Sequence, residues 1–160
     1  MKMTARWMLM ITMPFVLLGA SCSSSKDASS PSTADVPSTD AAAAGETVSV
    51  SLNQWTITPT ATTVPSGPVT FDVTNDGTMT HEFVVLQTET AASEIPIKSF
   101  EGETDRINED TAGTNVGETG DMEAGTSQTL KLDLAPGHYV LVCNLPSHYG
   151  LGMHTDFTVA

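Results

Sequence analysis

Apolar and polar residues alternate in short segments from residue 46 to the end of the chain, and turn residues separate these segments. In the first segment Val48, Val50 and Leu52 alternate with Ser and Thr, and the same period of two returns in residues 69–73 and 126–134. A period of two places the apolar side chains of a segment on one face of a β-strand. Short strands of this kind, with turns between them, predict an all-β chain, a Greek-key β-sandwich of about seven to eight strands.

The segment after the turn Asn75-Asp76-Gly77 differs from the other strands. Residues 83–87 contain a continuous apolar run rather than an alternating one, which predicts a strand that is buried on both faces. Residues 139–143 and 156–160 supply the last two strands. This arrangement leaves one long stretch between the buried strand and the final part of the chain.

Residues 88–126 do not follow the strand pattern. They carry ten acidic side chains and, as bases, only Lys98 and Arg106, which gives a net charge of −8. We expect one long acidic insertion that holds at most a short helix or strand, and Met122 within it needs no functional role. A loop of this length is either functional or partly disordered, and a solvated loop without a partner is an equally good interpretation.

The beginning of the chain is typical of an export signal. Lys2 and Arg6 precede an apolar run of 14 residues, which is too short to span a bilayer comfortably. The run ends in small residues before Cys22, a pattern that resembles a bacterial lipoprotein processing site. Cleavage there would remove residues 1–21 as the signal peptide and leave Cys22 lipid-modified, whereas an ordinary signal peptide would be cut nearby. Both alternatives export the protein.

Composition changes again between the signal and the first strand. Residues 22–45 are rich in Ser, Ala and Pro and contain no aromatic side chain, so they bury too little apolar surface to fold. We expect a disordered tether, which either spaces the domain from a membrane or is simply a disordered terminus. The predicted organisation is therefore a signal peptide (1–21), a tether (22–45) and a folded domain (46–160).

Charge and cysteine content exclude some classes of protein. The chain has a formal net charge of −13, and nucleic acid is therefore not an expected partner, because binding phosphates needs clustered Lys and Arg. Its two cysteines cannot form a disulfide-rich scaffold or a four-cysteine zinc site. If Cys22 carries lipid, Cys143 is the one thiol left in an oxidising compartment, where it would be reactive, intermolecular, a metal ligand or a buried structural residue.

A thiol, an imidazole and a thioether lie close together near the end of the chain. Cys143, His148 and Met153 have the spacing C-x4-H-x4-M, in a segment whose Pro and Gly residues indicate a tight loop. Soft sulfur ligands together with imidazole suit copper, which cycles between Cu(I) and Cu(II). A second histidine would complete the set. The best candidate is His81, at the start of the buried strand.

This pattern resembles the cupredoxins, the small blue copper proteins such as plastocyanin, azurin, auracyanin and rusticyanin, over residues 46–160. The resemblance implies one copper ion per chain, with His81, Cys143 and His148 as strong ligands and Met153 as a weak axial ligand. The longer gap between Cys and His is similar to that of auracyanin and rusticyanin. The sequence departs from the family at Glu82, where cupredoxins often have an Asn that steadies the copper loop.

The remaining candidates have weaker patterns. His138 falls on the opposite strand face from Cys143, so we expect it to be exposed. His154 is interpreted as a surface residue or a spare ligand, and Met79 as part of an apolar rim around the site or as a core residue. Tyr149 and Leu151 flank His148 and are expected to line a surface patch through which electrons pass.

Three functions fit these residues. The first is a monomeric one-electron carrier, not an enzyme, that is anchored through Cys22 and faces the periplasm or the cell exterior. Its partner would be another redox protein, such as a basic cytochrome or a copper oxidase, which the acidic charge would attract. The second is a protein for copper storage, delivery or homeostasis. The third is a cupredoxin-like binding module without copper.

Overall fold

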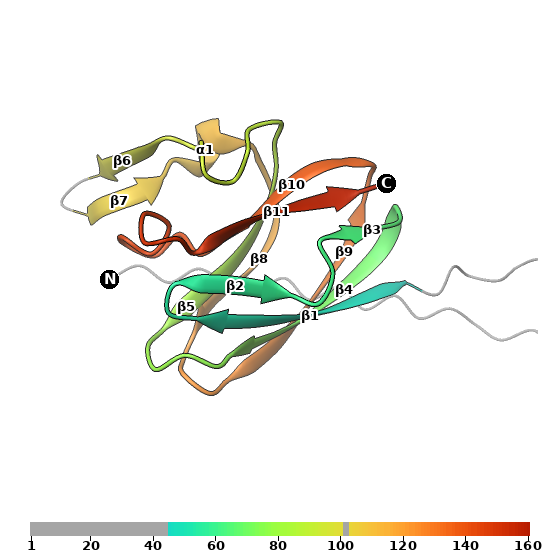
Figure 1. Cartoon of the computed structure of the whole chain (residues 1–160), viewed down its shortest axis with the longest axis horizontal. Coiled ribbons are helices and arrows are strands. Elements are labelled where there is room, and N and C mark those ends of the chain that lie inside the picture. The colour runs from blue at the N-terminus through green and yellow to red at the C-terminus, as the bar shows by residue number, and fades with distance from the viewer. Residues whose placement is uncertain (1–44, 101–102) are drawn as a thin grey trace, which may run out of the picture. The chain divides into compact units, whose positions relative to one another are not determined.

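The computed structural model describes residues 45–160 except residues 101–102 (Figure 1). The predicted signal peptide, Cys22 and nearly all of the predicted tether lie outside the described residues. In the described part, no helix is both long enough and apolar enough to cross a membrane.

The described residues form three β-sheets, and the two larger ones make a β-sandwich, which confirms that prediction (Figure 1). The first sheet has the strand order β2-β1-β4-β9 and the second has the order β3-β11-β10-β5-β8. The strands of the first sheet are β1 (Glu46–Asn53), β2 (Thr56–Pro59), β4 (Gly67–Asn75) and β9 (Ser127–Leu134). Those of the second are β3 (Thr63–Val64), β5 (His81–Gln87), β8 (Thr114–Met122), β10 (Gly137–Val142) and β11 (His154–Val159).

The alternating residues of the strands form the core between the sheets. Val48, Val50 and Leu52 of β1 are buried, as their spacing predicts. Phe71 of the first sheet packs against two rings of the second, Phe83 at 5.4 Å and Phe157 at 5.5 Å between centroids. Burying a side chain of this size stabilises the fold by roughly 1.5–3 kcal/mol, so this layer holds the two sheets together.

The outer face of the second sheet is covered by part of the acidic segment. This part contains β6 (Ile97–Phe100), β7 (Glu103–Ile107) and the short helix α1 (Glu109–Ala112). It buries Ala92, Ile95 and Ile107 in a second apolar cluster with residues of β5 and β10. The continuous apolar run of β5 is thereby buried on both faces, which confirms that prediction.

The acidic segment is less of an insertion than the sequence predicts. Residues 114–122 form β8, a strand of the sandwich that pairs with β5. Strand β8 lies at the edge of its sheet, and most of its residues, except Met122, are exposed or only partly buried. The apolar alternation that marks the other strands is therefore almost absent. We use the name "insertion brace" for the described residues of the shorter segment that remains, 88–100 and 103–113.

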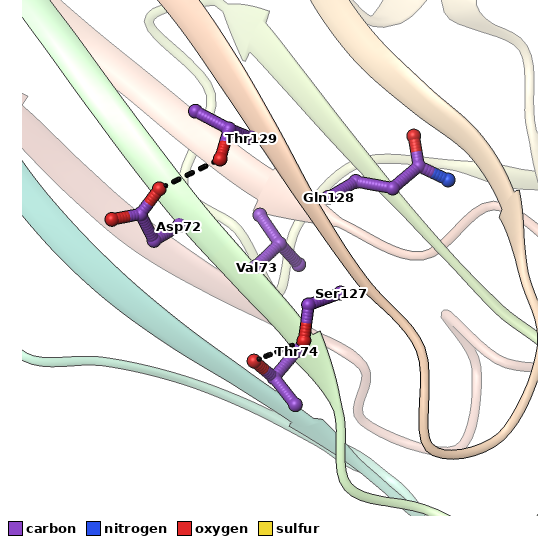
Figure 2. Close-up of a pocket in the computed structure, with 6 residues that line it drawn as sticks. All are labelled: Asp72, Val73, Thr74, Ser127, Gln128 and Thr129. Carbon is purple, nitrogen blue, oxygen red and sulfur yellow. Dashed lines mark hydrogen bonds between the residues drawn. The ribbon is translucent and has the colours of Figure 1, made fainter.

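The outer face of the first sheet is polar. Thr129 donates a hydrogen bond to Asp72 across β4 and β9 (2.9 Å), and the hydroxyls of Thr74 and Ser127 are 3.0 Å apart (Figure 2). These pairs line a shallow pocket together with Val73 and Gln128. None of the predicted copper ligands lies there, so the functional site is elsewhere.

Candidate metal centre

A buried asparagine fixes the turn that leads to His81. Asn75 is fully buried at the end of β4, and its amide donates to the carbonyl oxygens of Met79 and Met122, each at 2.8 Å. Its Oδ1 accepts the main-chain N–H of Gly77 at 3.0 Å. Two of these bonds lie within the turn and the third joins it to the end of β8, so together they fix where β5 begins with His81.

The loop after β10 brings three of the predicted ligands together, and we call residues 143–153 the ligand loop. The main-chain N–H of Cys143 donates to the carbonyl of Met153 at 3.0 Å, which closes the base of the loop. The N–H of Met153 donates in turn to the carbonyl of His148 at 3.1 Å. The main chain of Met153 is therefore bonded to those of Cys143 and His148. Its side chain is fully buried.

The donor atoms of three side chains converge between β5 and the ligand loop. Nδ1 of His148 lies 3.3 Å from Nδ1 of His81 and 3.3 Å from Sγ of Cys143. All three atoms lie within 4.8 Å of one another. Within the described residues this is the one group of three His, Cys, Asp or Glu side chains arranged to hold a metal. The geometry brings together the two histidines and the cysteine that the sequence singled out, whereas Met153 as the axial ligand stays a prediction.

The electrostatics of the cluster favour the metal-binding forms of the imidazoles. Burial lowers the pKa of His81, and the neighbouring His148 lowers it further. Burial also lowers the pKa of His148. Both rings are therefore neutral near pH 7, which leaves one nitrogen lone pair on each for a metal.

The thiol of Cys143 is influenced by two opposing effects. Its pKa is raised overall, chiefly by burial, while the main-chain amides of Leu145 and Glu82 oppose this by donating to the sulfur. The Glu82 N–H lies 3.3 Å from Sγ. The Leu145 N–H comes from within the ligand loop, two residues after the thiol. Two amides aimed at one sulfur stabilise a thiolate, and they would tune the potential of a metal bound to it.

The cluster fits a copper ion by the chemistry of its donors. Two neutral imidazole nitrogens and a thiol sulfur face one another, and a shared cation would satisfy all three. The other nitrogen of His81, Nε2, is buried and has no hydrogen-bond partner among the described side chains and main chain. A Cβ atom on Gly77 would lie 2.9 Å from that nitrogen, so the ring is enclosed on this side as well.

Glu82 shows what replaces the asparagine expected after the first histidine. Its main-chain N–H donates to the sulfur, but Oε2 of its carboxyl is buried and has no hydrogen-bond partner in the described structure. Burial, followed by the charges of Glu109 and Glu118, raises the pKa of this carboxyl to about 7. Glu82 therefore does not brace the ligand loop through its side chain.

Two residues of the site were not assigned a role from the sequence. Trp55 packs edge-on against His148, with ring centroids 5.2 Å apart. Asn144, directly after Cys143, is buried and bonded to the insertion brace through Ile107. The sequence pattern of a loop does not reveal which of its residues are buried. The role of Asn144 beside a ligand could therefore be recognised only from the structure.

The secondary candidates have mixed outcomes. His138 is on the outer face of β10 as predicted, but it is half-buried rather than exposed, with Nδ1 2.6 Å from the Thr88 carbonyl and Nε2 2.9 Å from Asp156. His154 packs its ring against Tyr149 at 4.7 Å and is not one of the three converging residues. The side chains of Met79 and Met122 also differ from each other: Met79 is 41% exposed, which favours the rim, and Met122 is buried.

A β-sandwich that brings one histidine of β5 together with a cysteine and a histidine of the ligand loop defines the class of this protein, a blue copper protein of the cupredoxin type with one copper per chain. Residues 41–160 match the family model described as the sulfocyanin (SoxE) domain. This match covers most of the sequence, so the chain belongs to the sulfocyanin family.

Solved structures agree on the fold. The chain is similar to reduced auracyanin from Roseiflexus castenholzii, with 23% identity, a TM-score of 0.52, and coverage of 72% of this chain and 98% of that one. It is also similar to auracyanin B (21% identity, TM-score 0.51, 72% and 88% covered). A third similar structure is an azurin from Methylomonas sp. strain J (16% identity, TM-score 0.51, 73% and 99% covered). No curated protein sequence matches the chain.

Proposed function

We propose that this blue copper protein is a one-electron carrier, with its copper held strongly by His81, Cys143 and His148 and weakly by Met153. The observation that carries the proposal is the convergence of three donor atoms within 4.8 Å, two of them on buried side chains. When bound, copper supplies a Cu(I)/Cu(II) couple. No residue of the cluster is placed to transform a substrate, so the protein is proposed to be a carrier and not an enzyme.

The side chains of the site are held so that a change of oxidation state needs little movement. Asn75 fixes the turn before His81, and main-chain bonds link Cys143, His148 and Met153 to one another. Ligands held by such networks keep one geometry in both oxidation states. The energy needed to reorganise the site on electron transfer is therefore small, which is the requirement for a fast carrier.

An apolar rim offers a route for the electron. Among the described residues, the exposed large apolar side chains are Met79, Ile97 and Leu151. Met79 lies two residues before His81, Leu151 belongs to the ligand loop, and Ile97 Cδ1 would be 3.9 Å from a Cβ on Gly150 of that loop. Leu151 also donates its main-chain N–H to the carbonyl of the half-buried His148 at 3.2 Å. A partner that docks on the rim would take the electron through this imidazole.

The proposed partner is another redox protein with basic charge, such as a cytochrome or a copper oxidase. The support is the net charge of −13, much of which falls in residues 88–126. Opposite charges would raise the rate of encounter, and the effect would weaken with salt. The carrier is proposed to act as a monomer.

The proposed location is the outer side of a bacterial membrane, with Cys22 lipid-modified. The support is the signal-like segment before Cys22 and the Ser- and Ala-rich segment after it. If Cys22→Ser remains with the membrane fraction after cell breakage, the anchor is wrong. Release of that variant into the soluble fraction supports it.

A copper storage or delivery protein is the alternative function. Such a protein would be expected to carry exposed Met- and His-rich tracts, whereas the thiol here is fully buried and few methionines follow the predicted signal. Addition of Cu(II) to the purified protein separates the two. An intense thiolate-to-copper band with reversible reduction supports the carrier. A colourless product that binds only Cu(I) supports delivery, and a band that survives in Cys143→Ser refutes the ligand assignment.

A further inference from the structure

The residues that directly follow two of the proposed ligands both bond to the insertion brace. Asn144 follows Cys143, and Tyr149 follows His148. Each of them is buried, and each uses its polar group on a main-chain atom of residues 88–113. The ligand loop is thus attached from outside the sandwich at the two positions next to its strong ligands.

The attachment through Asn144 has three hydrogen bonds. Its Oδ1 accepts the N–H of Ile107 at 2.9 Å, and its Nδ2 donates to the carbonyl of the same residue at 3.2 Å. Nδ2 also donates to the carboxylate of Glu109 at 2.7 Å. The amide therefore pairs with one residue's main chain in both directions, as a neighbouring strand would. It is 3% exposed, so water does not readily replace these bonds.

The attachment through Tyr149 is made at the other end of the brace. Its hydroxyl donates to the carbonyl of Ala92, and the N–H of Ala92 donates to Asp156 on β11 at 2.8 Å. Asp156 also contacts His138 of β10 at 2.9 Å. The residue that receives the tyrosine is therefore itself fixed to the second sheet.

The two strands of the brace also approach the loop directly. A Cβ on Gly150 would lie 3.7 Å from Cβ of Asp105 and 3.9 Å from Cδ1 of Ile97, which is ordinary van der Waals contact. Figure 1 shows the loop before β11 beside β7. Both strands of the brace therefore lie beside the ligand loop at Gly150, in addition to the hydrogen bonds at Asn144 and Tyr149.

We propose that the insertion brace is part of the copper site, and that Asn144 and Tyr149 are positioning residues that hold Cys143 and His148 for the metal through Ile107, Glu109 and Ala92. This inference rests on the proposed copper-binding function. It assigns to the brace the task that a side chain at the position of Glu82 often performs in cupredoxins. A purely structural role would stabilise the fold without affecting the state of the ligands.

The test uses the full chain with Cys22→Ser, so that Cys143 is the one thiol that reacts. Asn144→Ala removes one attachment, and Tyr149→Phe removes only a hydroxyl from the other. Tyr139→Phe is the matched control for the tyrosine, because its hydroxyl donates to the carbonyl of Ala135 at 2.9 Å, which lies outside both the brace and the ligand loop. Val69→Ala, in the core of the first sheet, controls for a general loss of stability.

Two measurements are made on each variant. The first is the rate at which the metal-free thiol reacts with a disulfide reagent, and it needs no copper. The brace predicts a rise of roughly tenfold for Asn144→Ala and Tyr149→Phe, because the loop opens more often, and no rise for the controls. The second is the loss of Cu(II) to a chelator, which we expect to become about 10–100-fold faster in the same two variants, with a changed ratio of the visible bands.

The inference is overturned if Asn144→Ala and Tyr149→Phe lower the unfolding temperature as the controls do but leave the thiol rate, copper loss and band ratio unchanged. Should Asn144→Ala fail to fold, Tyr149→Phe and its control decide alone. If the unmodified site gives no thiolate band with Cu(II), the proposed function fails, and the metal-free thiol rates still decide whether the brace holds the loop.

Discussion

Gly77 is the residue whose substitution most directly tests how His81 is held. A Cβ built at this position would lie 2.9 Å from Nε2 of His81 and 3.1 Å from Oδ1 of Asn75. It would also lie 2.7 Å from Oε1 of Gln54. Contacts this short require at least one of these groups to move, and the three differ in how easily they can.

Gln54 is the group that can yield most easily, because it is half-buried and its amide bonds to Thr78. The other two cannot, since Asn75 is committed to three hydrogen bonds and His81 is fully buried. Overpacking of this kind costs about 1–3 kcal/mol. We therefore expect Gly77→Ala to displace the imidazole and to weaken copper binding by about 10–100-fold, which matches that energy range.

The assay is a competition for copper with a chelator of known affinity, together with denaturant unfolding of the metal-free protein. Gly120→Ala is the control, because Gly120 has a φ of +68° and nothing within 4 Å of its Cβ position. It should cost roughly 1–2 kcal/mol in backbone strain and leave copper affinity unchanged. Copper affinity of Gly77→Ala equal to that of the control would refute the reasoning, since the histidine would then not depend on this close packing.

Three further predictions concern the same site. Glu82→Gln should leave the metal-free protein as stable as the unsubstituted protein below about pH 4.5 and make it more stable above about pH 7. The reason is that the folded state favours the protonated carboxyl of Glu82, and this contribution to stability is lost as the pH rises to the raised pKa of that group. The free energies of unfolding of the two proteins should differ by about 1–3 kcal/mol at most, and an equal pH dependence of both would contradict the burial of this carboxyl. Met153→Leu should retain copper and its colour but shift the reduction potential in voltammetry, since a weak axial ligand tunes the couple; an unchanged potential would argue against Met153 as a ligand. Stoichiometric copper should raise the unfolding temperature in calorimetry, because only the folded chain joins His81 to Cys143, and a second equivalent should add nothing.

The sandwich could be predicted because its strands obey one rule. Val48, Val50 and Leu52 are buried in alternation, and the buried run of β5 is covered on both faces. Strand β8 was not predicted, because it is an edge strand with little apolar alternation. Main-chain pairing with β5, rather than burial of its side chains, places it in the sheet. A prediction from the alternation of apolar residues depends on side-chain burial, so it cannot detect a strand that is held chiefly by main-chain hydrogen bonds.

The converging residues of the site could be predicted because ligand chemistry and spacing restrict them together. Cys143 and His148 are close in sequence, and His81 was the best candidate for the second histidine because it follows a turn and opens the buried strand. The groups that hold them were not predictable in the same way. Asn75 and Asn144 act through bonds to the main chain of distant segments, and any residue can offer such partners, so only the folded structure identifies them.

The position of the brace changes the meaning of the acidic charge. From sequence alone, the charge of residues 88–126 is a surface that would attract a basic partner. In the fold, Glu109 accepts hydrogen bonds from Asn144 and Asn115, at 2.7 and 2.9 Å, and its charge helps to raise the pKa of Glu82 beside the thiol. A carboxylate committed in this way is less available to a partner. Salt would therefore weaken partner binding by less than the count of acidic residues suggests, and neutralising Glu109 should disturb the ligand loop more than the rate of encounter.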